Sequence, residues 1–155
     1  MKFICSLIVV EDVAKARHLY ETVLKQKVVA DFGENVAFQG FALHKRDHYK
    51  TLINDKPIVP GSNAFELYFE EDDLETLAGE LKAGGFAFVH DLREQPWKQK
   101  VLRFYDYDQN IIEVGERLEH TAYRLSRDGY SLEDISRITY LPPEKVQAAI
   151  EEYSS

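Results

Sequence analysis

The first 115 residues combine strand-like and helix-like hydrophobic patterns in a fixed order. Residues 2–10, KFICSLIVV, form an apolar, β-branched run that is typical of a strand. Apolar positions then follow helical spacing from residue 13 to residue 24, and Asp12 is suited to cap that helix. Three short extended runs follow, with Gly33 and Gly40 as turn residues, at 27–31, 34–39 and 41–45. The predicted order is therefore βαβββ.

The same order restarts after a polar connector at about residues 46–62. A strand is predicted at 63–70, a cap at Asp72-Asp73, and a helix that Gly84-Gly85 closes. Three further strands are predicted at 86–90, 100–106 and 110–114. Aligning the two capping acids places Cys5 and Glu66 each seven residues before its cap, so the repeat has a register. We expect an α+β fold in which two βαβββ units form a curved mixed sheet with a central pocket.

Residues 116–155 have a helical pattern instead. Three helices are predicted, one of them capped by Ser131 and the last starting at Pro142-Pro143. The domain boundaries expected are therefore 1–115 for the paired βαβββ domain and 116–155 for a three-helix C-terminal extension. The last two helices resemble a helix-turn-helix, but the second of them is rich in glutamate, which matches DNA phosphates poorly. A packing or dimer-forming role is favoured.

Composition narrows the classes of partner. With 45% hydrophobic and 30% charged residues, the chain is typical of ordinary globular proteins. Its net charge of −8 argues against nucleic acid and favours a cationic ligand. The single cysteine allows no intramolecular disulfide, which indicates a cytoplasmic location. The apolar run 3–10 is too short to span a bilayer, so no membrane partner is expected.

Polar residues set into apolar strands mark the face that would open onto the pocket. Glu66 and Glu113 interrupt two such strands, and a buried carboxylate is costly unless it is paired, hydrogen-bonded or bound to a metal. With His44 they would suit Fe, Mn, Ni or Zn, and a thiolate from Cys5 would favour Zn. The alternatives are a buried core position for Cys5 and an exposed strand end for His44.

Two stretches resemble a known family. EDVAKARHLYETVLKQKV is similar to the first helix and turn of the vicinal oxygen chelate proteins, which include glyoxalase and bleomycin-resistance proteins, and QPWKQKVLRFYDYDQNIIEV is similar to their closing signature. The chain departs from that signature at Lys98, Tyr107 and Gln109. The resemblance implies a divalent metal, and its ligands would come from the first, fourth, fifth and eighth strands, namely Cys5, His44, Glu66 and Glu113.

The second copy carries further candidate residues for a small-molecule site. Arg103 could bind a carboxylate or phosphate, and Tyr68 and Tyr105 share its predicted face. His90 and Trp97 lie before the seventh strand, where a loop could close over a ligand. We therefore expect Tyr68, Arg103, Trp97 and His90 to contact substrate.

Three functions remain open from the sequence. The first is a glyoxalase-like, metal-dependent lyase or isomerase in which the metal polarises an oxygen-bearing substrate, with Glu66, Glu113 and Tyr105 as catalytic residues. The second is a non-catalytic protein that sequesters a cationic drug or metabolite, like bleomycin-resistance proteins. The third is a ligand-sensing regulator that acts through the C-terminal helices. A homodimer is expected in each case.

Overall fold

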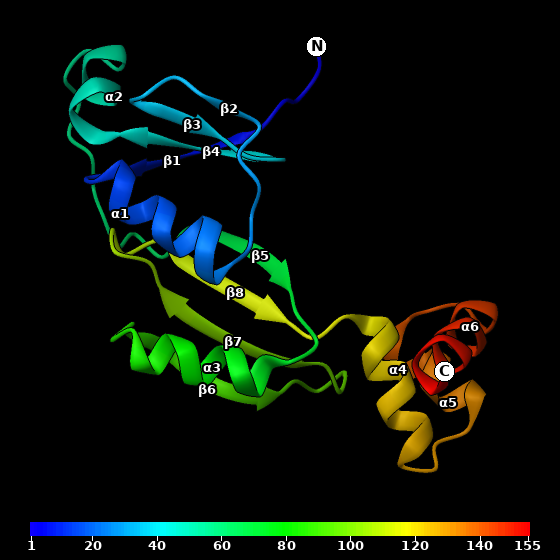
Figure 1. Ribbon diagram of the computed structural model, residues 1–155. Helices are drawn as coiled ribbons and strands as arrows, with labels where there is room; N and C mark the ends of the chain where they lie inside the picture. Colours follow the sequence, from blue (N-terminus) through cyan, green and yellow to red (C-terminus); the bar gives the residue numbers. More distant parts are fainter. The chain divides into compact units, whose positions relative to one another are not determined.

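The computed structural model describes all 155 residues, and they form two compact units. The first unit contains residues 1–65 and 105–111, and the second contains residues 66–104 and 112–155. The fold class is α+β, as predicted, because each copy of the βαβββ repeat forms its own four-stranded sheet (Figure 1). The strand orders, β1-β4-β3-β2 and β5-β8-β7-β6, are equivalent, which confirms the repeat.

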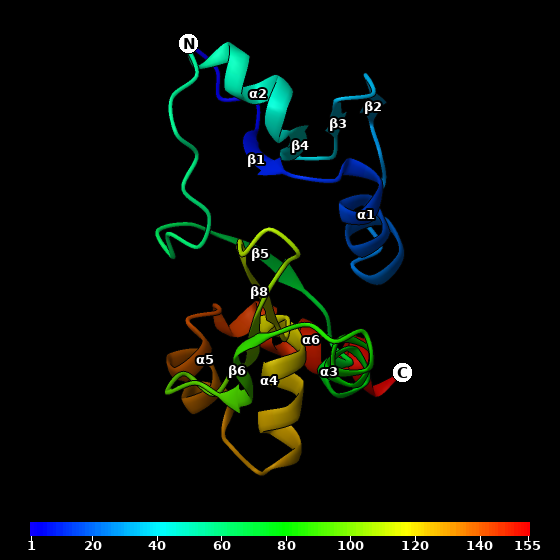
Figure 2. The same ribbon diagram turned by 90° about the vertical axis from the view of Figure 1, so that its left-hand side faces the viewer.

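The first unit contains the elements of the first copy. Its strands are β1 (Ser6–Val10), β2 (Ala30–Asp31), β3 (Asn35–Ala37) and β4 (Phe41–Lys45). Its helices are α1 (Val13–Arg17), the π-helix η1 (His18–Val23) and α2 (Arg46–Leu52). β1 and β4 are parallel, whereas β3 is antiparallel to both β2 and β4. In Figure 2, α1 lies beside this sheet and α2 follows β4.

The core of the first unit is aromatic. Tyr20 and Phe41 have ring centroids 5.4 Å apart, and Phe38 stacks on Phe41 at 4.7 Å. Tyr20 is fully buried, and its hydroxyl donates a 2.9 Å hydrogen bond to Asp106. Asp106 belongs to the turn at residues 106–110 between β7 and β8, so this turn is held in the first unit although it connects two strands of the second copy.

The second unit contains the second copy and the C-terminal helices. Its strands are β5 (Glu66–Glu70), β6 (Phe88–Glu94), β7 (Lys100–Tyr105) and β8 (Ile111–Gly115). The last residue of β7 and the first residue of β8 belong to the first unit. Helix α3 (Leu74–Ala83) covers one face of this sheet, where Lys100 pairs with Glu75 of α3. Because side chains alternate along a strand, Arg103 lies on the opposite face.

Three helices follow β8, as the sequence predicts. They are α4 (Leu118–Arg127), α5 (Leu132–Thr139) and α6 (Pro143–Ser154). Their shared core consists of five buried residues, Ala122, Leu125, Ile135, Val146 and Ala149. No helix of the chain has both the length and the apolar character needed to cross a membrane.

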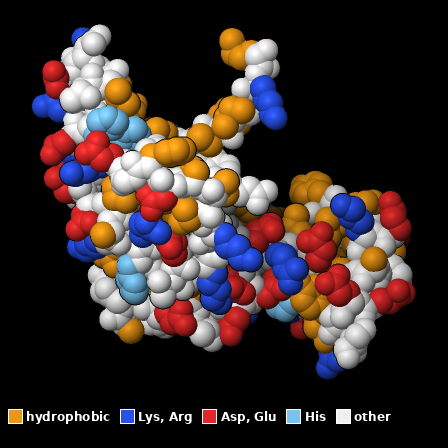
Figure 3. Space-filling model, turned by 45° about the horizontal axis from the view of Figure 1, so that its top comes forward, with side chains coloured by type: hydrophobic (Ala, Val, Ile, Leu, Met, Phe, Trp, Pro, Cys, Tyr) orange, Lys and Arg blue, Asp and Glu red, His pale blue; other side chains and the backbone are white.

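The structure corrects four details of the sequence-based assignment. β6 continues to Glu94, so His90 lies within a strand and not at the start of a loop. β1 starts at Ser6, not at residue 2, and the apolar side chains of Phe3 and Ile4 before it are exposed. Figure 3 shows hydrophobic side chains along a projecting segment of the chain. The connector predicted as a loop contains α2. The first helix changes to π-helical form at His18, which hydrophobic spacing alone does not signal.

Candidate functional site

Arg103 forms the centre of a cluster on the sheet face of the second unit opposite α3. Its Nε donates to Glu66 Oε2 at 3.0 Å, and its Nη2 donates to Glu113 Oε2. The three residues come from β7, β5 and β8, so the sheet itself fixes their positions. The structure therefore brings together both glutamates and the arginine that the sequence predicts on one face.

The two carboxylates have different acidities. The hydrogen bond from Arg103 holds the pKa of Glu66 below its ordinary value, although partial burial opposes the shift. Burial raises the pKa of Glu113, and Arg103 only partly offsets it while the nearby Glu66 adds to it. The more buried Glu113 is therefore the better proton acceptor of the pair, and Glu66 keeps its charge to lower pH.

His90 completes the surroundings of Arg103. It is the cross-strand partner of Arg103 in the β6–β7 ladder, and Arg103 Nη1 lies 3.2 Å from its Nε2. His90 Nδ1 lies 2.9 Å from the carbonyl oxygen of Asp91, which only accepts hydrogen bonds, so Nδ1 carries the proton. This tautomer directs the lone pair of Nε2 at the guanidinium.

Two exposed aromatic residues lie at one end of the same unit and are joined by Gln99. Trp97 Nε1 donates to Gln99 Oε1 at 2.9 Å, and Gln99 Nε2 donates to the hydroxyl of Tyr68 at 3.0 Å. Tyr68 in turn donates to Glu70 at 3.1 Å. Burial, with Glu70 close by, raises the pKa of Tyr68 to about 12, so its hydroxyl stays protonated at neutral pH. Tyr68 and Trp97 are 48% and 43% exposed and are available to a ligand.

Gly115 at the end of β8 makes room for the Tyr68 ring. A Cβ atom there would lie 3.0 Å from Tyr68 Cε2 and 3.0 Å from Gln99 Nε2. We expect Gly115→Ala to lower the free energy of unfolding by about 1–2 kcal/mol, because the ring and the amide must move. The same shift should increase acrylamide quenching of Trp97, the only tryptophan of the chain.

Gly79→Ala is the matched control for this substitution. Gly79 lies inside α3, and a Cβ atom there meets nothing within 4 Å. Alanine should therefore stabilise the helix by about 0.5–1 kcal/mol and leave Trp97 quenching unchanged. Wild-type quenching and stability in Gly115→Ala would contradict the tight contact.

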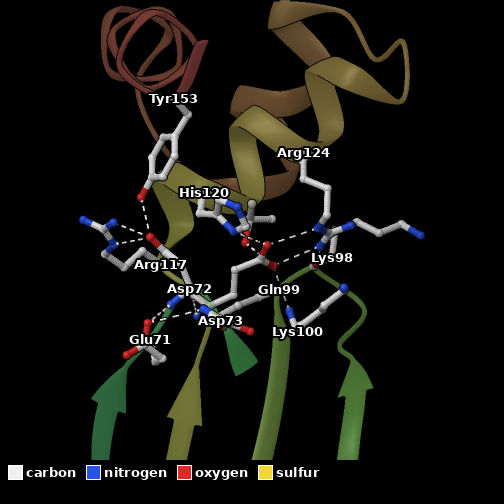
Figure 4. Close-up of polar contacts among 12 residues, drawn as sticks. Glu71, Asp72, Asp73, Lys98, Gln99, Lys100, Arg117, His120, Arg124 and Tyr153 are labelled. Carbon is white, nitrogen blue, oxygen red and sulfur yellow. Dashed lines mark hydrogen bonds and ion pairs between the residues drawn. The ribbon is translucent and has the colours of Figure 1, made fainter. Parts of the chain in front are cut away.

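A buried ion cluster joins this sheet to the C-terminal helices. Glu116, which is 1% exposed, accepts a hydrogen bond from Arg124 Nε at Oε1 and one from Arg124 Nη2 at Oε2, and His120 Nδ1 lies 2.8 Å from Oε1 (Figure 4). The Glu116 backbone carbonyl also accepts from Gln99 at 2.7 Å. A second set of contacts joins Asp72 to Arg117 and to the Tyr153 hydroxyl. Gln99 therefore contacts both the aromatic end of the candidate site and the first residue after β8.

The remaining predicted site residues lie in the first unit. His44 at the end of β4 is buried, with Asn35 Nδ2 3.1 Å from its Nδ1 and His48 Nδ1 2.7 Å from its Nε2. Burial, together with the neighbouring His48, lowers the pKa of His44. Cys5 is exposed and precedes β1, so it is not the core residue that the sequence alternative describes. The Tyr105 hydroxyl donates to Asn63 at 3.0 Å.

The carboxylates of the second unit do not fit a divalent metal in this arrangement. A metal ligand needs a lone pair that points at the ion, whereas Glu66 and Glu113 each direct an oxygen at Arg103. With Arg103 in place, neither unit contains three or more His, Cys, Asp or Glu side chains grouped to hold a metal ion. The positive charge that the sequence assigns to a metal beside these carboxylates is supplied here by the guanidinium.

Gln99 and Gly115 are the site residues that sequence reasoning missed. Gln99 lies two and four residues before Val101 and Arg103, so strand alternation places it on the predicted pocket face. Gly115 follows Glu113 by two residues and is on that face for the same reason. Extending each predicted strand by one residue would have found both.

Two βαβββ units with equivalent strand orders define the class of fold, and sequence comparison defines the family. Residues 3–119 match the family described as a glyoxalase-like domain, so the chain belongs to that family, within the vicinal oxygen chelate superfamily. A comparison with functionally curated proteins gave no significant match.

Solved structures agree with this assignment. A protein of unknown function from Agrobacterium tumefaciens str. C58 is 34% identical, with a TM-score of 0.66 over 75% of this chain and 94% of that one. A glyoxalase-related enzyme from Fulvimarina pelagi is 16% identical, with a TM-score of 0.62 over 76% and 89%. A lactoylglutathione lyase from Agrobacterium tumefaciens is 18% identical, with a TM-score of 0.56 over 75% and 93%. The last two similarities concern the fold alone.

Proposed function

We propose that this protein is a glyoxalase-like small-molecule-binding protein that takes a ligand with a positively charged group. The ligand lies on the sheet face of the second unit that carries Glu66, Arg103 and Glu113. This is the sequestration function that the sequence leaves open as an alternative to a metal-dependent lyase or isomerase. The geometry favours it because Arg103 engages one oxygen of each carboxylate and supplies the positive charge that a metal would otherwise provide.

The observation that carries the proposal is the charge balance of the cluster. Two carboxylates, Glu66 and Glu113, face a single guanidinium, so the acidic side chains of the cluster outnumber its one permanent cation. Glu66 is the more exposed carboxylate, with 39% of its side chain accessible, and it can contact a ligand without unfolding the sheet. The net charge of the whole chain, −8, attracts the same kind of ligand.

The aromatic residues support the same ligand class. A cation over the face of a tyrosine or tryptophan ring gains about 0.5–2 kcal/mol, depending on how well water is excluded. Tyr68 follows Glu66 by two residues on β5 and therefore shares its face. Gln99 holds Tyr68 and Trp97 near each other by hydrogen bonds, so the two rings are positioned before a ligand arrives.

A matched pair of probes tests the charge requirement. Benzamidinium and benzamide have nearly the same shape but differ by one positive charge. We expect a panel of such cations to quench Trp97 fluorescence at concentrations at least tenfold lower than the neutral partners. Glu66→Gln should weaken cation binding about tenfold, or about 1.4 kcal/mol, and the effect should shrink as salt is added.

Glu80→Gln provides the control for this measurement. Glu80 lies on α3, on the other side of the sheet, and is exposed. Its substitution removes the same charge from the chain but should leave the affinities within a factor of two. Equal affinities for charged and neutral probes, or equal losses in the two variants, would refute the proposed site.

A further inference from the structure

Three acceptor atoms from three different strands surround one guanidinium. They are Glu66 Oε2 on β5, Glu113 Oε2 on β8 and His90 Nε2 on β6, and each faces a different nitrogen of Arg103. Two carboxylates and one imidazole form a ligand set that suits a divalent ion. The chain places Arg103 inside that set.

The histidine is also oriented as a metal ligand would be. Metal-bound histidines usually donate their second ring N–H to a carbonyl or carboxylate, which fixes the tautomer and directs the lone pair at the metal. His90 makes this contact to the Asp91 carbonyl, and its lone pair meets Arg103 Nη1 at 3.2 Å. The acceptor set is therefore complete and already occupied by a cation.

Burial explains why this cation is retained. Glu113 is 7% exposed, and a carboxylate at that depth needs a positive partner or a proton. Arginine is well suited to this role, because it stays charged and presents several donors in a rigid plane. A metal ion would have to displace a partner that contacts both glutamates and the histidine, and would leave that guanidinium without its acceptors.

We propose that Arg103 is the resident cation of this site, so that its guanidinium stands where a divalent metal would otherwise be held by Glu66, Glu113 and His90. The site is then independent of metal, and its fixed positive charge is part of the chain. This inference does not depend on the ligand class proposed above, because its test uses metal alone.

The first experiment measures metal on the intact protein. Wild-type protein is purified without chelator, equilibrated with Mn²⁺, which carboxylates bind well, and analysed for bound metal by equilibrium dialysis. We expect the amount of bound Mn²⁺ to be the same in wild type and in Glu113→Gln. Near-stoichiometric Mn²⁺ in wild type that disappears in Glu113→Gln would overturn the proposal.

The second experiment removes the resident cation. In Arg103→Ala, the more exposed Glu66 can close on an ion together with Glu113 and His90. We expect Mn²⁺ affinity to rise at least tenfold over wild type. The gain should disappear in the double variant Arg103→Ala/Glu113→Gln. Arg93→Ala removes an exposed arginine of the same strand as His90 and should leave the Mn²⁺ affinity at the wild-type value.

Folding of these variants is checked by circular dichroism with and without Mn²⁺. Arg103→Met retains the apolar stem of the side chain and replaces Arg103→Ala if the latter does not fold. A variant that folds, or is stabilised, only with Mn²⁺ supports the proposal. A folded variant with wild-type Mn²⁺ affinity would overturn the proposal. If neither variant folds, the comparison of bound Mn²⁺ between wild type and Glu113→Gln decides whether the proposal holds.

Discussion

Glu116→Gln is expected to lower the free energy of unfolding by about 3 kcal/mol, because it removes the buried carboxylate that pairs with Arg124. The guanidinium would keep only its contacts to the exposed Glu94 and to the Lys98 carbonyl. The carboxylate accepts two hydrogen bonds from Arg124, one from the Thr121 hydroxyl and one from the Lys100 backbone N–H. An amide cannot accept at both ends, so one donor would face another donor. Urea unfolding followed by circular dichroism measures the loss.

The pH dependence of this effect has a definite sign. Burial alone would raise the pKa of Glu116, but the hydrogen bonds from Arg124, Lys100 and Thr121 outweigh it and hold the pKa below the ordinary value of 4.5. A depressed folded-state pKa gives stability that is present above the unfolded value and is lost as pH falls through the folded one. The difference between wild type and Glu116→Gln should therefore be constant above about pH 5 and shrink below pH 4.5.

Glu119→Gln is the control on the same helix. It removes one acidic charge from the first turn of α4 without touching the Glu116 cluster. Its effect should stay within about 0.5 kcal/mol at every pH. Equal losses in the free energy of unfolding for Glu116→Gln and Glu119→Gln would contradict a stabilising role of the buried cluster.

Asp106→Ala is expected to cost about 3–4 kcal/mol, because four hydrogen bonds end on this one buried carboxylate. Oδ1 accepts from the backbone N–H groups of Asp108 and Asn110, and Oδ2 accepts from the Asn110 side chain and the Tyr20 hydroxyl. Alanine would leave the buried Tyr20 hydroxyl without its acceptor and loosen the turn.

Tyr20→Phe separates the two parts of this effect. It removes only the hydroxyl and should cost about 1 kcal/mol, since the turn keeps its backbone contacts to Asp106. Thermal unfolding of the two single variants and the double variant measures the coupling between them. A loss in Asp106→Ala no larger than that in Tyr20→Phe would show that the turn contacts add nothing.

The repeat and its capping residues were readable from the sequence because they depend on local chemistry. Asp12 and Asp73 cap their helices through the backbone N–H groups of Lys15 and Thr76, and Ser131 caps α5 in the same way. Strand alternation also placed Glu66, Arg103 and Glu113 on one face, where the structure has them. These features need no information about distant residues.

The partner of the two carboxylates could not be read in the same way. The sequence shows that Glu66 and Glu113 need a positive charge, but a metal and an arginine meet that need equally well until cross-strand register is known. The ladder that pairs His90 with Arg103 contains register shifts on both sides of His90. A bulge of this kind leaves no clear hydrophobic signal in the sequence. The cluster of Glu66, His90, Arg103 and Glu113 could therefore be found only from the structure.

The turn at residues 106–110 has a consequence for how the chain can be divided. It connects two strands of the second copy but belongs to the first unit, where Asp106 holds Tyr20 and Asp108 accepts from the backbone N–H of Glu11. A gene cut at the repeat boundary would therefore leave the first copy without the loop that completes it. The two copies of the repeat are therefore not interchangeable. Truncation or domain-exchange designs must keep this loop with the first copy.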